Sequence, residues 1–194
     1  MSARERTHWD NVYRERGKTQ SRPINPLLLK YTPPILKQEI ENTKRALDLA
    51  AGFGQNGLWL ATVGYIADLM DISPVALKYT REEIAIRQLS NVNLFQVDLD
   101  EVDLDEAKYD LICVFRYTNR NLLPRIRAAI VPGGRIIYET PNTDYLQVKP
   151  DLDREQLFVP GELAGHFDNW NILHSSDVDF HSQLVAVKPD DSVV

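Results

Sequence analysis

Residues 46–57 read ALDLAAGFGQNG, and this stretch decides the fold. A short apolar run that contains one acid, Asp48, leads directly into three glycines with the spacing G-x-G-x-x-G. Gly52 and Gly54 let the backbone approach a ligand without an intervening side chain, and Gly57 allows close packing where a helix begins. The spacing alone is a weak signal, because dinucleotide-binding turns and plain tight turns also produce it. We predict a strand, a turn and a helix, with a ligand at the turn.

The segments around this stretch alternate between short apolar runs and longer amphipathic ones. We expect strands at residues 45–50, 65–70, 91–97, 109–115, 135–140, 170–176 and 181–189, and helices at 57–63, 73–90 and 119–131. Ser73 can cap the second helix, and Pro74 suits its first turn. Alternating strands and helices indicate a parallel sheet covered on both faces. The last two strands leave no room for a helix between them and should pair antiparallel.

These patterns predict one α/β domain over residues 1–194, in which residues 1–40 form an N-terminal arm over the site. The expected fold is three-layered, doubly wound and Rossmann-like. Its seven-stranded sheet is mostly parallel with one antiparallel strand.

Composition limits the classes of function. The net charge of -6 and the isoelectric point near 5.2 argue against broad attraction to nucleic acid or anionic lipid. The single cysteine, Cys113, excludes an internal disulfide, and the four histidines show no metal-ligand spacing. No stretch has the roughly 20 apolar residues that a membrane span needs, and the charged N-terminus does not resemble a secretory signal. We expect a cytoplasmic protein, monomeric or homodimeric, with no metal and no membrane partner.

Three acids mark the ends or interiors of successive predicted strands. Asp48 lies inside the first strand, where a nicotinamide-binding fingerprint would be apolar. Asp71 ends the second strand, roughly twenty residues past the turn, where a carboxylate can accept hydrogen bonds from both ribose hydroxyls. Asp98 ends the third, where it can accept a hydrogen bond from an exocyclic amine, with Leu99 beside the same ring. Together the acids favour a cationic adenosine ligand that lacks phosphate.

Each acid also has a structural alternative. Asp48 could be a buried acid held by backbone amides. Asp71 could cap a helix, although Ser73 already suits that position. Asp98 could be a solvated member of the acidic run at 98–106.

With these motifs in place, the sequence resembles the class I S-adenosylmethionine-dependent methyltransferases. The similar motifs are DLAAGFGQNG (48–57), MDISPVAL (70–77), VDLDEV with YDLICVFRY (97–117) and IVPGGRIIYET (130–140). WDNVY (9–13) and VFRYTNRNLLP (114–124) are similar to the tellurite-resistance-type branch of small-molecule methyltransferases. The chain departs from the family at Ala51, where cysteine is common. It also departs at Asn119, where relatives often carry a histidine, and this puts a general base in doubt.

The resemblance implies S-adenosylmethionine as cofactor and S-adenosylhomocysteine as product. The implied cofactor contacts are Asp48, Ala50, Gly52, Gly54, Asn56, Asp71, Ile72, Asp98, Leu99 and Phe115. The implied catalytic residues are Arg116, Tyr117 and Asn119, and the implied substrate or lid residues are Trp9, Tyr13 and Arg120. Two alternatives stay open: Trp9 and Tyr13 could pin the arm to the core, and Arg116 could be a structural charge.

The expected reaction is methyl transfer to a small acceptor, either anionic or soft, such as a thiol or a metalloid oxyanion. Arg116 and Arg120 would attract an anion. The amine-methylating signature Asn/Asp-Pro-Pro-aromatic is replaced by VFRY, so nucleic acid is an unlikely acceptor. Two alternatives remain. One is a protein that binds S-adenosylmethionine without transfer, suggested by Asn119. The other is an NAD-dependent oxidoreductase, which Asp48 and the lack of a Tyr-x-x-x-Lys pair disfavour.

Overall fold

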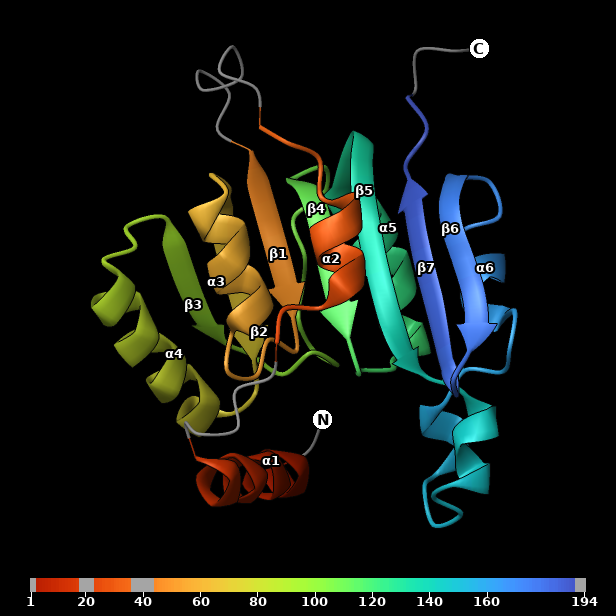
Figure 1. The fold of residues 1–194 in the computed structure, drawn as a ribbon, viewed down its shortest axis with the longest axis horizontal. Coiled ribbons are helices and arrows are strands. Elements are labelled where there is room, and N and C mark those ends of the chain that lie inside the picture. The colour runs from red at the N-terminus through yellow and green to blue at the C-terminus, as the bar shows by residue number, and fades with distance from the viewer. Residues whose placement is uncertain (1–2, 18–22, 36–43, 191–194) are drawn as a thin grey trace. The chain divides into compact units, whose positions relative to one another are not determined.

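The structure, a computed structural model, describes residues 3–17, 23–35 and 44–190 (Figure 1). Residues 1–2, 18–22 and 36–40 of the predicted arm lie outside the described residues. The chain divides into two compact units, Met1–Asp103 (unit 1) and Leu104–Val194 (unit 2).

The elements of each unit follow in chain order. Unit 1 contains α1 (Ala3–Arg16), α2 (Pro26–Tyr31), β1 (Arg45–Leu49), α3 (Gln55–Thr62), β2 (Ile66–Asp71), α4 (Pro74–Arg87) and β3 (Val92–Gln96). Unit 2 contains β4 (Tyr109–Phe115), η3 (Arg120–Leu122), α5 (Leu123–Ala129), β5 (Ile130–Pro141), η4 (Thr143–Gln147), η5 (Arg154–Gln156), α6 (Glu162–Gly165), β6 (Asn171–Val178) and β7 (His181–Val187). The strand order is β3-β2-β1-β4-β5-β7-β6. β7 runs antiparallel to both of its neighbours, so the predicted seven-stranded mixed α/β fold is confirmed.

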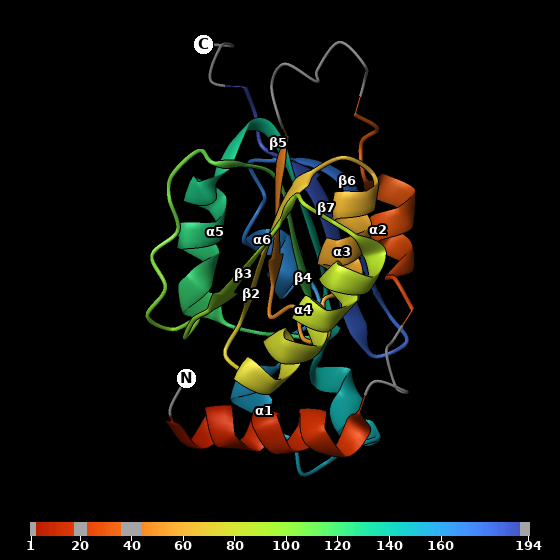
Figure 2. The same cartoon turned by 90° about the vertical axis from the view of Figure 1, so that its left-hand side faces the viewer.

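Unit 1 is built on three parallel strands. Asp48 of β1 lies beside Leu69 of β2, and Asp71 at the end of β2 lies beside Gln96 at the end of β3. The carboxyl ends of these strands therefore share one edge. Helices α3 and α4 pack against the strands, and Figure 2 shows α2, α3 and α4 on the same side of them.

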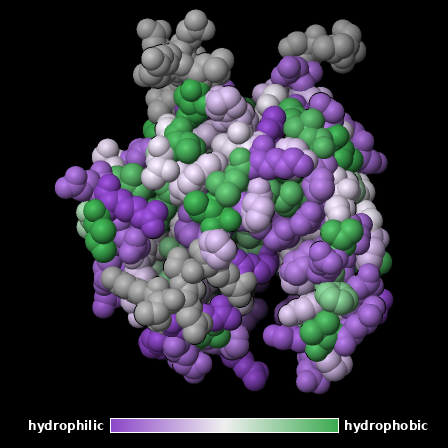
Figure 3. All heavy atoms as spheres, in the orientation of Figure 1, coloured by the Kyte–Doolittle hydropathy of each residue, from purple (hydrophilic) through white to green (hydrophobic). Residues whose placement is uncertain are grey.

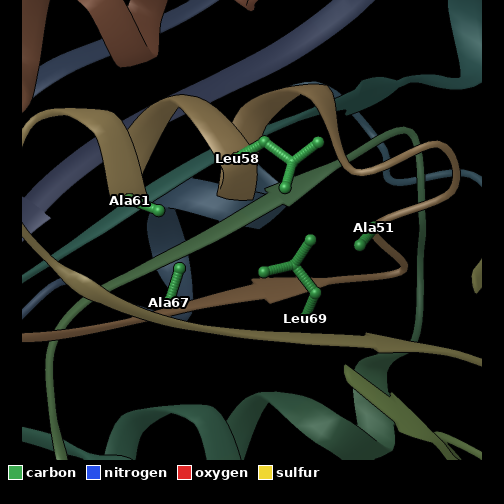
Figure 4. Packing of buried hydrophobic residues seen from close by; sticks show 5 residues of the cluster. All are labelled: Ala51, Leu58, Ala61, Ala67 and Leu69. Carbon is green, nitrogen blue, oxygen red and sulfur yellow. The ribbon is translucent and has the colours of Figure 1, made fainter. Parts of the chain in front are cut away.

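A small apolar cluster joins α3 to this sheet. Ala51, Leu58, Ala61, Ala67 and Leu69 are buried together, as Figure 4 shows. Gly57 faces the same cluster: a Cβ added to it would lie 2.6 Å from Leu69 Cδ1. The last glycine of the motif is therefore required by packing, as the sequence predicts.

Helix α4 begins as its sequence predicts. The Ser73 hydroxyl accepts a hydrogen bond from Ala76 N at 3.2 Å, and Pro74 occupies the first turn. The helix ends at Arg87, and the cap residue after it, Gln88, adopts a left-handed conformation with φ 55°.

Unit 2 differs from the prediction at one strand start. β5 begins at Ile130 rather than at residue 135, because Ile130 pairs with Tyr109 before the register shifts. The helix expected over 119–131 is consequently shorter. It consists of η3 and α5, and it ends at Ala129 where the chain enters the sheet.

No helix in the described ranges is long and apolar enough to cross a membrane. On the face drawn in Figure 3, the coloured hydrophobic residues lie in small groups separated by hydrophilic ones.

Candidate functional site

The carboxylate of Asp71 connects the glycine turn to the end of β2. Its Oδ2 accepts a hydrogen bond from Gly52 N at 2.8 Å, and its Oδ1 accepts one from Ser73 N at 2.8 Å. Only 4% of Asp71 is exposed. Each carboxylate oxygen has a second acceptor direction. Asp71 can therefore accept a further hydrogen bond from a ligand that carries neighbouring hydroxyls.

The environment of Asp71 disfavours its charged form. Burial raises the pKa of this carboxyl, and the hydrogen bonds from the N–H groups of Ser73, Gly52 and Ile72 partly oppose that effect. The carboxylate of Asp10 raises the pKa further by repulsion. The site is thus electrostatically suited to a ligand that brings hydrogen-bond donors or positive charge.

The backbone of the turn takes unusual conformations and is closely covered. Gly52 has φ 57° and Gly54 has φ 73°, and Ala50 takes φ 53° although it is not glycine. A Cβ on Gly52 would lie 2.9 Å from the Tyr13 hydroxyl, and one on Gly54 would lie 2.6 Å from Thr80 Cγ2. Both glycines are therefore positions where a side chain would not fit.

Two of the residues predicted to contact the cofactor accept hydrogen bonds from backbone N–H groups of the protein. Asp48 is 2% exposed, and its Oδ2 accepts a hydrogen bond from Gly57 N at 2.8 Å. Asn56 is 3% exposed, and its Oδ1 accepts one from Asn25 N at 3.0 Å. Asp48 thus has the structural role proposed as its alternative, and Asn56 ties the segment before α2 to α3.

The predicted adenine contacts differ in exposure. Ile72 and Leu99 are buried at 8% and 0% exposure. Asp98 is half-buried, and its Oδ1 accepts a hydrogen bond from Asp100 N at 3.0 Å. Val97 N donates to the Asp71 carbonyl at 3.1 Å, so the ends of β2 and β3 are joined.

Helix α1 lies against the turn through aromatic and polar contacts. The Tyr13 ring packs on Phe53 with centroids 5.0 Å apart, and Trp9 packs on Tyr13 at 6.0 Å. Ser73 Oγ donates a hydrogen bond to Asp10 Oδ1 at 2.5 Å. The sequence analysis did not select Asp10. The available signal was its place in WDNVY, three residues before Tyr13 and hence on the same helix face.

In unit 2 the end of β4 carries the predicted acceptor-side residues. Phe115 is 7% exposed, whereas Arg116 is exposed and adopts φ 59°. Arg116 N donates to the Glu139 carbonyl at 2.7 Å. The Tyr138 hydroxyl donates to the Tyr117 carbonyl at 2.7 Å, and burial raises the pKa of Tyr138 far above its usual range. Tyr138 is therefore a structural phenol rather than a base.

Asn119 caps η3. Its Oδ1 accepts a hydrogen bond from Leu122 N, and its Nδ2 donates to the Tyr117 hydroxyl, both at 3.2 Å. An amide does not accept a proton at neutral pH. A catalytic role for Asn119 as a general base therefore has no support in its chemistry or its contacts.

Arg120 is engaged within unit 2. Its Nε and Nη2 donate to the two carboxylate oxygens of Glu162 at 2.5 and 2.8 Å. Its other donors reach the carbonyls of Glu155 and Leu157, and its guanidinium lies over the Phe158 ring. The ion pair lowers the pKa of Glu162. Arg120 therefore holds residues 154–162 together through these contacts. This differs from its predicted role, which was to attract an anionic acceptor.

Unit 1 therefore brings together Gly52, Asp71 and Tyr13, with Trp9 beside Tyr13. Unit 2 places Phe115 at the end of β4, and Arg116, Tyr117 and Asn119 lie in the segment that follows it. The sequence analysis missed Asp10 and also Thr80, whose hydroxyl donates to the Gly52 carbonyl at 3.3 Å.

Comparison with known proteins agrees with this geometry. Residues 46–134 match the family described as a methyltransferase domain. No curated protein sequence matches the chain. A protein from Pyrococcus horikoshii OT3 has a similar structure, with 15% identity, 93% of this chain and 98% of that chain covered, and a TM-score of 0.71.

Two further solved structures share the fold. One is an S-adenosylmethionine dependent methyltransferase from Mesorhizobium loti, with 17% identity, 84% of this chain and 96% of that chain covered, and a TM-score of 0.67. The other is TehB from Haemophilus influenzae, with 18% identity, 82% and 65% covered, and a TM-score of 0.63. At these identities the structures establish the fold, and residues 46–134, less than half of the chain, match a methyltransferase domain, in agreement with the predicted enzyme class.

Proposed function

We propose that this chain transfers a methyl group from S-adenosylmethionine to a small, soft or anionic acceptor. One observation carries the proposal. The Asp71 carboxylate is fixed at the end of β2 by the N–H groups of Gly52 and Ser73, directly beside a turn that has no room for side chains. The methyltransferase match over residues 46–134 gives the reaction class. Structures described as S-adenosylmethionine dependent methyltransferases, with the same fold, support the cofactor.

The residues present fit this cofactor. A carboxylate with unused acceptor directions suits the two ribose hydroxyls. Residues 46–57 contain no lysine or arginine, which suits a ligand without phosphate. Asp71 would hold the ribose, Gly52 and Gly54 would lie along the methionine part, and Ile72, Asp98 and Leu99 would adjoin the adenine.

S-adenosylmethionine supplies a methyl group activated by a sulfonium. What the protein adds is alignment to within about 3–3.5 Å of the acceptor atom and exclusion of water. The hydrogen-bonded turn and Asp71 would hold the cofactor in a fixed position for that alignment.

The residues after β4 support the proposed acceptor class. Arg116 is an exposed cation, so an anion is favoured there. The side chains beside it are the Tyr117 phenol and the Asn119 amide, and neither has an ordinary pKa near neutrality. An acceptor that is already nucleophilic needs no base, as with a thiolate or an oxyanion of selenium or tellurium. Fold similarity to TehB agrees with the tellurite-resistance-type branch, which we propose as the narrower assignment.

Calorimetry tests the cofactor. S-adenosylhomocysteine should bind in the micromolar range, and NAD should bind at least tenfold more weakly. Failure of S-adenosylhomocysteine to bind at high micromolar concentration would reject the proposal. Tighter binding of NAD would instead support an oxidoreductase.

A coupled assay for released homocysteine tests the transfer. Thiols, selenite and tellurite should give turnover, whereas phenols and amines should give at least tenfold less. If S-adenosylhomocysteine binds but no acceptor in the panel turns over, the protein is better described as a cofactor-binding protein, the alternative that Asn119 suggests.

A further inference from the structure

Asp10 of α1 and Asp71 of β2 are joined through a single residue. The Ser73 hydroxyl donates to Asp10 Oδ1 at 2.5 Å, while Ser73 N donates to Asp71 Oδ1 at 2.8 Å. Only 13% of the Asp10 side chain is exposed. The nearest charged partner of Asp10 is Arg14 on the same helix, 3.9 Å away. This bond therefore fixes α1 to the residue that also positions Asp71.

A second contact from α1 lies on the other side of Asp71. Tyr13, three residues after Asp10, places its hydroxyl 2.9 Å from the position that a Cβ of Gly52 would take. Gly52 N is the other donor to Asp71. Helix α1 therefore touches both residues that hold the Asp71 carboxylate. Figure 2 shows this helix crossing unit 1 at the end where α4 begins.

These contacts have a consequence that rests on the proposed function. The ribose hydroxyls must reach Asp71, but Asp71 is 4% exposed while α1 is in this position. The space that Gly52 leaves open by lacking a side chain is taken by the Tyr13 hydroxyl. In this position α1 therefore covers the two residues that hold the Asp71 carboxylate, beside which a ligand on Asp71 would lie.

We propose that Asp10 is a positioning residue that controls access to the cofactor site. Its hydrogen bond to Ser73 holds α1 over Asp71, and α1 must leave before the cofactor enters. A protein whose binding-competent form is only partly populated has its apparent affinity reduced by that fraction. Removing the Asp10 bond increases the open fraction, so the site binds faster and more tightly.

The experiment measures association and dissociation of S-adenosylhomocysteine by surface plasmon resonance. Asp10→Ala should raise the association rate constant about tenfold, the range expected when a hydrogen bond to a charged acceptor is lost. It should leave the dissociation rate constant within twofold. Asp10→Asn, which keeps an acceptor oxygen for Ser73, should give a smaller increase. Asn11→Ala is the matched control on the same helix, because Asn11 is exposed and accepts a hydrogen bond only within α1, from Arg14.

Two results would overturn the proposal. One is an unchanged association rate in Asp10→Ala, and the other is weaker binding, since that would make Asp10 a direct contact of the bound cofactor. Hydrogen exchange separates this inference from the proposed function, because it needs no ligand. Asp10→Ala should lower the protection of the amides in residues 3–16, and Asn11→Ala should not. If that result is obtained but no variant binds S-adenosylhomocysteine, the position of α1 stands and the cofactor assignment fails.

Discussion

The strand ends of unit 1 and unit 2 are built in different ways. At the end of β2, Asp71 is buried, and its carboxylate accepts hydrogen bonds from two backbone N–H groups. At the end of β4, Arg116 is exposed, and the Tyr117 carbonyl beside it accepts a hydrogen bond from the Tyr138 hydroxyl. The first arrangement holds the backbone in one shape. The second presents side chains that can change without altering the fold.

The largest expected difference between the two units is the effect on stability of adding a side chain at a glycine. Gly57→Ala would place a Cβ 2.6 Å from two carbons of Leu69, and overpacking of this kind costs about 3 kcal/mol. Gly165 of unit 2 has no atom within 4 Å of an added Cβ, so Gly165→Ala should change the free energy of unfolding by less than about 1 kcal/mol. Urea denaturation measures both. Equal effects would remove the contrast in packing between the two positions.

Asp71→Asn should give the next largest effect, on ligand binding. Loss of two hydrogen bonds to a charged acceptor should weaken S-adenosylhomocysteine binding about 100-fold. An amide has only one acceptor oxygen, so an N–H of Gly52 or Ser73 also loses its partner, and unfolding should become easier by about 1–3 kcal/mol. Calorimetry and thermal melts check this, with Asp103→Asn on an exposed acid as control. Normal affinity in Asp71→Asn would remove the ribose assignment.

The first three strands of the prediction agree with the structure because their signal is local. Alternation of apolar residues, the glycine turn and the Ser73–Pro74 helix start all act within a few residues. The same locality made Asp71 recognisable. By contrast, the ion pair of Arg120 with Glu162 spans 42 positions, and nothing near Arg120 in the sequence indicates that it is neutralised. The capping role of Asn119 could have been predicted from the sequence, because an asparagine before a short helix is typical of a cap.

Arg116→Met should have a moderate effect on the acceptor side. Loss of the exposed cation should raise the Michaelis constant of an anionic acceptor about tenfold and that of the cofactor less than twofold. Arg120→Met is the comparison within the same unit: it should lower stability while leaving the acceptor's Michaelis constant near that of the wild type. Steady-state kinetics over both substrates decides between them. Equal changes for both substrates in Arg116→Met would indicate a structural arginine.

The smallest expected effect concerns backbone strain at the two strand ends. Ala50 and Arg116 adopt φ 53° and 59°, a region that costs a residue with a side chain about 1 kcal/mol relative to glycine. Ala50→Gly and Arg116→Gly should each stabilise the fold by about that amount. Ala107→Gly, at φ 45° outside both strand ends, should stabilise to a similar degree without changing activity. A loss of activity in Ala50→Gly but not in Ala107→Gly would tie the strain at Ala50 to function.

The indole of Trp9 on α1 is an intrinsic fluorescent probe of the position of this helix. It is one of three tryptophans, with Trp59 on α3 and Trp170 just before β6, and it is half-buried against Tyr13. Trp9 and Tyr13 both belong to α1, whereas Phe53 belongs to the glycine turn, so movement of α1 would separate Tyr13 from Phe53 and change the surroundings of the indole of Trp9. The buried indole of Trp170 would keep its surroundings. Replacing Trp59 with phenylalanine would remove one of the other two indoles. The fluorescence emission wavelength of this unlabelled protein would then report the movement of α1 over time.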